Sequence, residues 1–340
     1  MKIKFGFGNT SEPKDNRQGL GKRRPQLSAP RINNSPPDLR NKDLFVSRDK
    51  LKCIKDLDKL VGLENVKELF EEIYSFVKID KRRQQEGLVS TPMVFHMIFK
   101  GNPGTGKTTV ARLMGKFFRE LGVLEKGHLH EVERADLVGE YVGHTAQKTR
   151  DQIRKSLGGV LFIDEAYSLA RGGGRDFGRE AIDALVKSME DYRKELVIIL
   201  AGYKEEMDLF IESNPGLRSR FPIQLEFQDF SVVQLTDIAM MMFGERQFFL
   251  TPEAEKHLET IINEEALDGH RYSGNGRFVR NLVEKTIRNQ ALRLAKSKSL
   301  TREQLILVEA CDLPASSYKI KRNDTLVSYE MAKRMLTPGG

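Results

Sequence analysis

Eight consecutive residues have the types and spacing of a phosphate-binding loop. They are Gly101, Asn102, Pro103, Gly104, Thr105, Gly106, Lys107 and Thr108. Glycines allow backbone N–H groups to surround phosphate oxygens, and the start of a following helix adds partial positive charge. Lys107 is expected to reach the β- and γ-phosphates, and the Thr108 hydroxyl to ligate Mg²⁺. The loop, with Thr109 directly after it, therefore predicts a site for ATP and Mg²⁺.

A pair of carboxylates follows an apolar run 57 residues beyond Lys107. Residues 160–163 are expected to form a buried strand that carries Asp164 and Glu165 to its C-terminal edge, where ligands bind in open α/β sheets. Asp164 suits the Mg²⁺ shell, and Glu165 suits a general base that polarises the attacking water. A protein that only binds a nucleotide does not need the second acid, so the pair predicts ATP hydrolysis.

The elements that must position these residues alternate between strands and helices up to residue 229. This order predicts an α/β fold with a five-stranded parallel sheet covered on both faces. The expected strands are 93–99, 129–133, 160–163, 196–200 and 223–227. The expected helices are 64–83, 107–121, 145–156 and 179–193.

After Phe230 the pattern becomes helical only. Helices are expected after Thr251-Pro252, over 277–296 and after Thr301, where Gln304 completes a capping box. A chain of 340 residues has room for about two domains. We therefore expect an α/β nucleotide-binding domain over 51–229, a small helical lid domain over 230–312 and a C-terminal tail over 313–340.

The first 50 residues carry most of the net charge of +8. They contain 12 Lys and Arg against 5 Asp and Glu, a net of +7, so the other residues carry only +1. Five of the twelve prolines also lie there. Such a segment buries too little apolar surface to offset its ordering entropy, which predicts a disordered basic arm. The arm can contact an acidic partner, whereas the nearly neutral folded part gives no reason to expect nucleic acid.

Several protein classes are excluded by the sequence. No apolar run approaches the ~18 residues that span a bilayer, and the first residues lack the apolar segment of a secretory signal. Cys53 and Cys311 have no metal or redox spacing, and the six histidines form no pattern of metal ligands. These observations predict a cytoplasmic protein with reduced thiols, and argue against a membrane protein, a disulfide-rich module and a zinc finger.

The two motifs with a helical domain behind them resemble the AAA+ ATPases, over about residues 56–312. Within this family the resemblance is greatest to the branch of stage V sporulation protein K and the CbbX-type rubisco activases, and is closer to the sporulation protein. It rests on the segments LVGEYVGHTAQKT, GGVLFIDEAYSLARGG, AGYKEEM, NPGLRSRFP and GNGRFVRN. The resemblance implies a ring, most simply a homohexamer, that remodels a protein substrate.

The resemblance also implies roles for residues outside the two motifs. Leu60, Val61 and Gly62 match the segment that would line the adenine pocket. Arg220, with Arg218 as the second choice, would be an arginine finger that reaches the γ-phosphate bound by a neighbouring subunit. Arg277 would reach the phosphates from the lid of the same subunit.

Three further expectations concern residues near these motifs. Arg280, one turn after Arg277, is expected to be structural. The methionines at 240–242 are expected to pack inside the lid. The position after strand 196–200 commonly holds a polar sensor residue in the family, but this chain has Ala201-Gly202-Tyr203, which leaves the assignment to Tyr203 open.

Tyr141 is the residue that indicates what ATP hydrolysis is used for. By resemblance, this aromatic residue in an apolar, glycine-flanked loop would project into the pore of the ring and grip an extended chain through apolar contact. Bacterial sporulation is the role that the resemblance suggests. The alternatives are a rubisco-activase-like metabolic chaperone, an ATP-dependent switch or scaffold that threads nothing, and a nucleic-acid motor that uses the basic arm.

Overall fold

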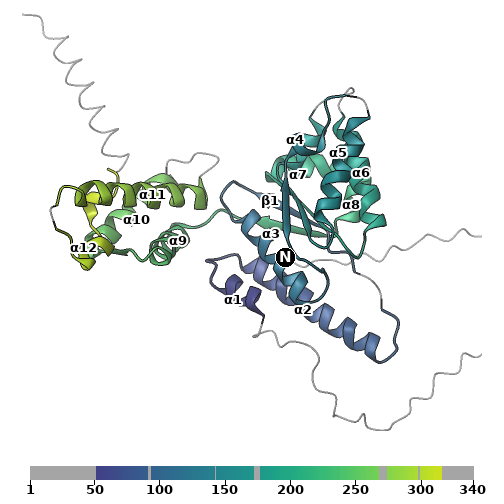
Figure 1. The fold of residues 1–340 in the computed structure, drawn as a ribbon, viewed down its shortest axis with the longest axis horizontal. Helices are drawn as coiled ribbons and strands as arrows, with labels where there is room; N and C mark the ends of the chain where they lie inside the picture. Colours follow the sequence, from purple (N-terminus) through teal and green to yellow (C-terminus); the bar gives the residue numbers. More distant parts are fainter. Residues whose placement is uncertain are drawn as a thin grey trace, which may run out of the picture. The chain divides into compact units, whose positions relative to one another are not determined.

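The computed structural model describes residues 51–90, 93–141, 143–171, 177–267, 274–297 and 299–315. Five parallel strands form one sheet in the order β2-β3-β4-β1-β5 (Figure 1). The strands are β1 (Met97–Gly101), β2 (Leu129–Val132), β3 (Val160–Ile163), β4 (Val197–Gly202) and β5 (Ile223–Phe227). The predicted five-stranded parallel sheet is confirmed. Because all strands run the same way, the segments that follow them emerge at one edge of the sheet.

The alternating side chains of the strands divide the core between the two faces of the sheet. One face carries Met97, Phe99 and Phe162, which pack against helices that lie together in Figure 1. These helices are α1 (Lys52–Asp58), α2 (Glu64–Gln85) and α3 (Lys107–Glu120). The helix α3 begins directly after the phosphate-binding loop, so its packing on the sheet fixes the position of that loop.

The opposite face carries Ile98, Leu161, Ile163 and Leu200, which pack against a second group of helices. This group comprises α4 (Arg134–Leu137), α5 (His144–Ser156), α6 (Gly178–Asp191), α7 (Lys204–Glu212) and α8 (Pro215–Arg220), with a short 3-10 turn at Ala166–Ala170. Burial on both faces explains why these strands have near-continuous apolar sequences, without a polar alternation.

The element boundaries differ from expectation in a few places. The first strand was expected over 93–99, but it begins at Met97 and ends at Gly101. The helices α1, α4, α7 and α8 were not predicted. Each has at most nine residues, which is too short to display a helical period, and α8 begins with proline as its only signal.

The segment after β5 forms a second apolar core of its own, around Leu235, Leu258 and Val279. Its helices are α9 (Val232–Glu245), α10 (Pro252–Leu267), α11 (Asn275–Leu294) and α12 (Arg302–Ile306). Capping boxes begin α9 at Ser231 and α12 at Thr301. The expectation of helices alone was wrong in one detail, because β6 (Phe249–Leu250) and β7 (Leu307–Val308) pair as a small parallel ladder. Two-residue strands have no sequence period to detect.

Some expectations concern residues outside the described part of the chain. The basic arm over 1–50 and nearly all of the tail over 313–340 lie there. None of the helices in the described ranges has the length and apolarity that a membrane crossing requires.

Candidate nucleotide-binding and hydrolysis site

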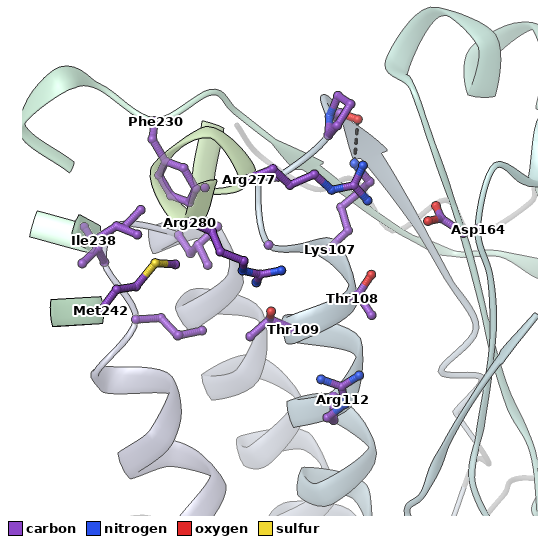
Figure 2. Close-up of a pocket in the computed structure, with 18 of the residues that line it drawn as sticks. Lys107, Thr108, Thr109, Arg112, Asp164, Phe230, Ile238, Met242, Arg277 and Arg280 are labelled. Atoms are coloured by element: carbon purple, nitrogen blue, oxygen red, sulfur yellow. Dashed lines mark hydrogen bonds between the residues drawn. The ribbon is translucent and has the colours of Figure 1, made fainter. Parts of the chain in front are cut away.

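A cavity of about 560 Å³ lies at the edge of the sheet where β1 and β3 end. The phosphate-binding loop, the acidic pair and residues of the lid all contribute to its lining. Figure 2 shows Lys107 and Thr108 at the start of α3, with Arg277 on one side of them and Asp164 on the other. The two motifs that are 57 residues apart in sequence therefore meet at one site, as the parallel order of the strands requires.

Backbone conformation shapes the phosphate-binding loop. Gly104 has φ +77° and Gly106 has φ +96°, a left-handed region that side chains other than glycine rarely adopt. The buried Thr105 hydroxyl donates a hydrogen bond of 2.8 Å to the Asn102 carbonyl, which closes the loop on itself. The loop is therefore held in shape by its own backbone and side chains.

Lys107 lies under this loop. Its Nζ donates hydrogen bonds of 2.8 Å to the Gly101 carbonyl and 2.7 Å to the Asn102 carbonyl. Burial lowers the pKa of Lys107 from its ordinary value to about 8, against the attraction of the Asp164 carboxylate, while Arg277 nearby adds to the lowering. A negatively charged phosphate at this place would stabilise the ammonium form, so the lysine is poised for an anionic ligand.

The acidic pair follows β3 directly. Glu165 has φ +46°, which is unusual for a residue other than glycine, and its N–H donates a 3.0 Å hydrogen bond to Asp164 Oδ1. Both residues line the cavity. Non-glycine residues in left-handed conformations concentrate at functional sites, where the surrounding structure holds them. The turn after β3 thus directs two carboxylate residues to the cavity that contains Lys107.

The donor set around the cavity fits Mg²⁺. Thr108 and Asp164 both line it and offer hard oxygen ligands. No group of three or more His, Cys, Asp or Glu residues that could hold a metal occurs in the described part of the chain. Mg²⁺ is usually held by one or two protein oxygens together with substrate phosphates and water, and Thr108 and Asp164 could supply such oxygens.

The lid contributes more to the cavity than the sequence indicated. Arg280, which was expected to be structural, lines it together with Arg277, one helical turn earlier on α11. Met241 and Met242 also line the cavity. Met240 and Met242 pack against the lid core, so Met242 does both. The expected packing in the lid is thus found for Met240 and Met242, while Met241 and Met242 also face the cavity. Methionines at consecutive positions of a helix face different sides, and sequence alone does not say which side faces a ligand.

Further lining residues had no motif to signal them. They are the apolar residues Leu63, Phe230 and Ile238 and the charged residues Arg112 and Glu245. Conversely, three residues expected to bind the nucleotide do not line the cavity: Gly62, Asn102 and Thr105. The Asn102 side chain instead donates hydrogen bonds to Asp229. Tyr203, which follows β4, does line the cavity.

The two candidate finger arginines are on α8 and do not line the cavity of their own subunit. Arg220 donates a 3.2 Å hydrogen bond to the Gly216 carbonyl and lies 3.4 Å from Glu190 Oε1 on α6. Arg218 is exposed. An arginine on α8 can therefore complete a phosphate site only in another subunit or after rearrangement.

Tyr141 is far more exposed than most aromatic side chains, with 66% of its surface accessible. Its ring contacts the His144 ring edge-on, with centroids 5.5 Å apart. The ends of this loop are held from α5, because the Gly139 N–H donates a 2.9 Å hydrogen bond to the buried Thr145 hydroxyl. The loop thus presents an exposed aromatic side chain on a fixed base.

Comparisons with known proteins agree with this geometry. Residues 97–229 match the family described as "ATPase family associated with various cellular activities (AAA)", and residues 231–323 match "AAA lid domain". The chain is 55% identical over 260 residues to stage V sporulation protein K of Bacillus subtilis, covering 76% of this chain and 81% of that protein. It is 45% identical over 264 residues to the chloroplastic ribulose bisphosphate carboxylase/oxygenase activase of Cyanidioschyzon merolae, covering 76% and 89%.

Two further similarities complete the comparison. Protein CfxQ of Xanthobacter flavus is 43% identical over 276 residues, covering 80% of this chain and 86% of that protein. A solved structure titled as the Thermotoga maritima RuvB Holliday junction branch migration motor aligns with TM-score 0.47 and 22% identity, covering 73% of this chain and 69% of that one. From the sheet, the phosphate-binding loop, the lid and the extent of these sequence matches, the chain belongs to the AAA family of ATPases.

Proposed function

We propose that this ATPase hydrolyses MgATP at the subunit interfaces of a ring, most simply a homohexamer, and uses the energy to remodel a protein in the cytoplasm. In this proposal residues 51–229 are the nucleotide-binding domain and 230–312 the lid. The single observation that supports remodelling, beyond hydrolysis, is Tyr141. The Tyr141 side chain is 66% exposed and contacts the His144 ring only edge-on, so most of its surface is accessible and suits a grip on an extended chain.

Each residue at the cavity has a proposed part in hydrolysis. Lys107 and the loop amides bind the phosphates, and Thr108 and Asp164 would hold Mg²⁺, which neutralises developing charge when bound. Glu165 accepts the proton of the attacking water as general base. Arg277 interacts with the phosphates from the lid, and Tyr203 after β4, which lines the same cavity, is the candidate for the polar sensor position.

The neighbouring subunit supplies a further charge in this proposal. Arg220 is the finger, with Arg218 as the alternative, because both are on α8 and neither lines the cavity of its own subunit. A mixing experiment tests this arrangement. Subunits with Arg220→Ala but an intact loop, combined with Lys107→Ala subunits that keep the finger, recover part of the ATPase at shared interfaces. Proven co-assembly without any recovery would refute a finger at Arg220 that acts across the interface.

The identity of the substrate is the second question, and it separates the sporulation proposal from its alternatives. The relative with 55% identity is named for sporulation, whereas relatives with 43–45% identity include a rubisco activase, so we favour sporulation. Glu165→Gln should bind ATP but hydrolyse it slowly, which keeps a substrate bound. Expressed in the parent cells, this variant should retain a sporulation protein. Retention of rubisco would favour the metabolic alternative, and retention of nothing would favour a switch or scaffold.

A further inference from the structure

Asp229 connects the phosphate-binding loop to the lid. This residue lies two positions after β5 and just before the lid helices begin. The Asn102 amide donates hydrogen bonds of 3.0 and 2.9 Å to its two carboxylate oxygens. The Asn275 amide donates a 2.8 Å hydrogen bond to Asp229 Oδ1. One carboxylate therefore accepts from the second residue of the phosphate-binding loop and from the first residue of α11.

Asn275 is held in an uncommon state. Its φ of +44° is left-handed, and only 1% of its surface is exposed. Its Oδ1 accepts a 2.9 Å hydrogen bond from the Phe230 N–H, so both ends of its amide have partners. Left-handed backbone at a residue other than glycine costs free energy and persists only where the surroundings fix it. The partners of the amide are those surroundings.

The backbones of the loop and of α11 also touch directly. The Gly276 N–H donates a 3.0 Å hydrogen bond to the Gly104 carbonyl. A Cβ atom at Gly104 would lie 2.5 Å from the Gly274 carbonyl oxygen and 2.8 Å from the Arg277 nitrogen. Only a glycine permits this approach, so two glycines and the Asp229 cluster join the loop to the start of α11 at the same place.

We propose that Asp229 and Asn275 are positioning residues that fasten the phosphate-binding loop to α11 and so hold Arg277 at the phosphates. Arg277 is two residues after Asn275, on the first turn of the same helix. Because helix α11 is tied to the loop at its first turn, any movement of the loop on nucleotide binding or hydrolysis moves Arg277 and the lid with it. This inference rests on the proposed role of Arg277.

The test is a double-mutant cycle on the full-length protein, with kcat and KM for ATP as readouts. Asp229→Asn keeps the size of the side chain but removes one acceptor and the charge. Asn275→Gly removes the amide while keeping a residue that tolerates φ +44°. Asp151→Asn is the matched control, because Asp151 accepts hydrogen bonds from Gln147 and Arg154 on α5 and does not line the cavity.

If Asp229 acts through Arg277, the effects are not multiplicative. Arg277→Ala alone should lower kcat by ~10²-fold, as for a lost charge-stabilising group. Asp229→Asn and Asn275→Gly should each lower kcat by ~10-fold, the usual size of an effect through a positioned group, with a smaller change in KM. In the Arg277→Ala background, either substitution should then change kcat by less than ~2-fold. Asp151→Asn should leave both constants unchanged.

Three outcomes would overturn the inference. If the effects multiply, or if kcat is unchanged in both Asp229→Asn and Asn275→Gly, the connection does not act through Arg277. The proposed role of Arg277 itself would then still stand. An unchanged kcat in Arg277→Ala would instead refute the proposed role of Arg277, and the inference with it. If Asp229→Asn proves unfolded by its thermal transition, Asn275→Gly decides alone, because its backbone conformation is retained.

Discussion

The phosphate-binding loop over 101–108 and the loop over 138–144 have a similar backbone conformation where each leads into a helix. They differ in whether their side chains contact the loop itself or are exposed to solvent. Each ends at a glycine in left-handed conformation that begins a helix, Gly106 before α3 and Gly143 before α5. In the first loop, the lysine and threonine side chains bond to loop carbonyls. In the second, Tyr141 is exposed to solvent.

The difference lies in what each loop has to hold. Phosphates are bound by charge and by backbone N–H groups, which must be arranged beforehand to be effective. An extended polypeptide substrate would be held through apolar contact area, so the side chain that holds it must be exposed. The base of the second loop is held from α5, where the Thr149 hydroxyl donates a 3.1 Å hydrogen bond to the Leu137 carbonyl and Lys148 Nζ donates a 3.2 Å hydrogen bond to the Val138 carbonyl.

The largest contrast is expected between Lys107→Ala and Tyr141→Ala in ATP binding. Lys107→Ala removes the charge at the phosphates and should weaken ATP binding by ~10²-fold, the upper range for a charged hydrogen bond. Tyr141→Ala should change ATP affinity by less than ~2-fold, since the two sites are independent. Equilibrium binding of a fluorescent ATP analogue measures both. Equal losses of ATP affinity in the two variants would mean that the two loops are energetically coupled, which would contradict the comparison.

Glycine substitutions sharpen the comparison, because Gly104 and Gly143 have similar φ angles of +77° and +82°. An added Cβ at Gly104 meets backbone atoms at 2.5 and 2.8 Å, whereas at Gly143 nothing lies within 4 Å. Both alanine variants carry the left-handed backbone cost of about 1–2 kcal/mol. Only Gly104→Ala should also weaken ATP binding, by ~10-fold or more. The added Cβ forces the phosphate-binding loop to shift, which displaces the N–H groups that donate to the phosphates.

Thermal unfolding together with ATP titration separates these costs. Similar losses of stability with a loss of ATP affinity at Gly104 alone would support the comparison. A loss of ATP affinity in Gly143→Ala would contradict it.

Tyr141→Ala should separate ATP consumption from work on the substrate. At ~25 cal/mol per Å², the 150–250 Å² of an aromatic side chain gives about 4–6 kcal/mol as the upper bound for a fully buried contact, and a pore contact reaches a fraction of that. Basal ATPase should persist, while remodelling and substrate-stimulated ATPase fall together. Tyr141→Phe is the control and should keep most activity. If Tyr141→Ala remodels its substrate fully, the alternative of an ATP-dependent switch or scaffold is favoured over threading.

The smallest expected effect is in the pH dependence of ATP binding. The pKa of Lys107 is lowered to about 8, so the free protein loses the charge as pH rises through that value. Bound phosphates favour the charged form, so ATP affinity should be nearly constant below about pH 7 and fall by ~4-fold between pH 7 and 8.5. Lys107→Arg stays charged and should flatten this profile. A wild-type affinity that is constant to pH 9 would contradict the lowered pKa.

Sequence reasoning succeeded where residue type is dictated by local geometry. The phosphate-binding loop requires glycines and a lysine at fixed spacing, and the strands before the acidic pair are too apolar to be anything but buried. It missed what depends on distant packing. Phe230, Met242 and Arg280 line the same cavity as Lys107, and nothing local to those residues signals a ligand. The connection from Asn102 to Asp229 spans 127 positions and left no pattern in either segment.

The order of strands in the sheet has a consequence for how the protein is made. In the finished sheet Met97 of β1 lies between Ile199 of β4 and Ile223 of β5, so both edges of β1 stay unpaired while about a hundred more residues are synthesised. Such long-range pairing is slow and leaves apolar strands open to misassembly. The ribosome must also pass Arg277 before the cavity is complete. The complete nucleotide cavity therefore exists only after the start of α11 has been made, so bound nucleotide cannot stabilise the sheet through Arg277 before that point.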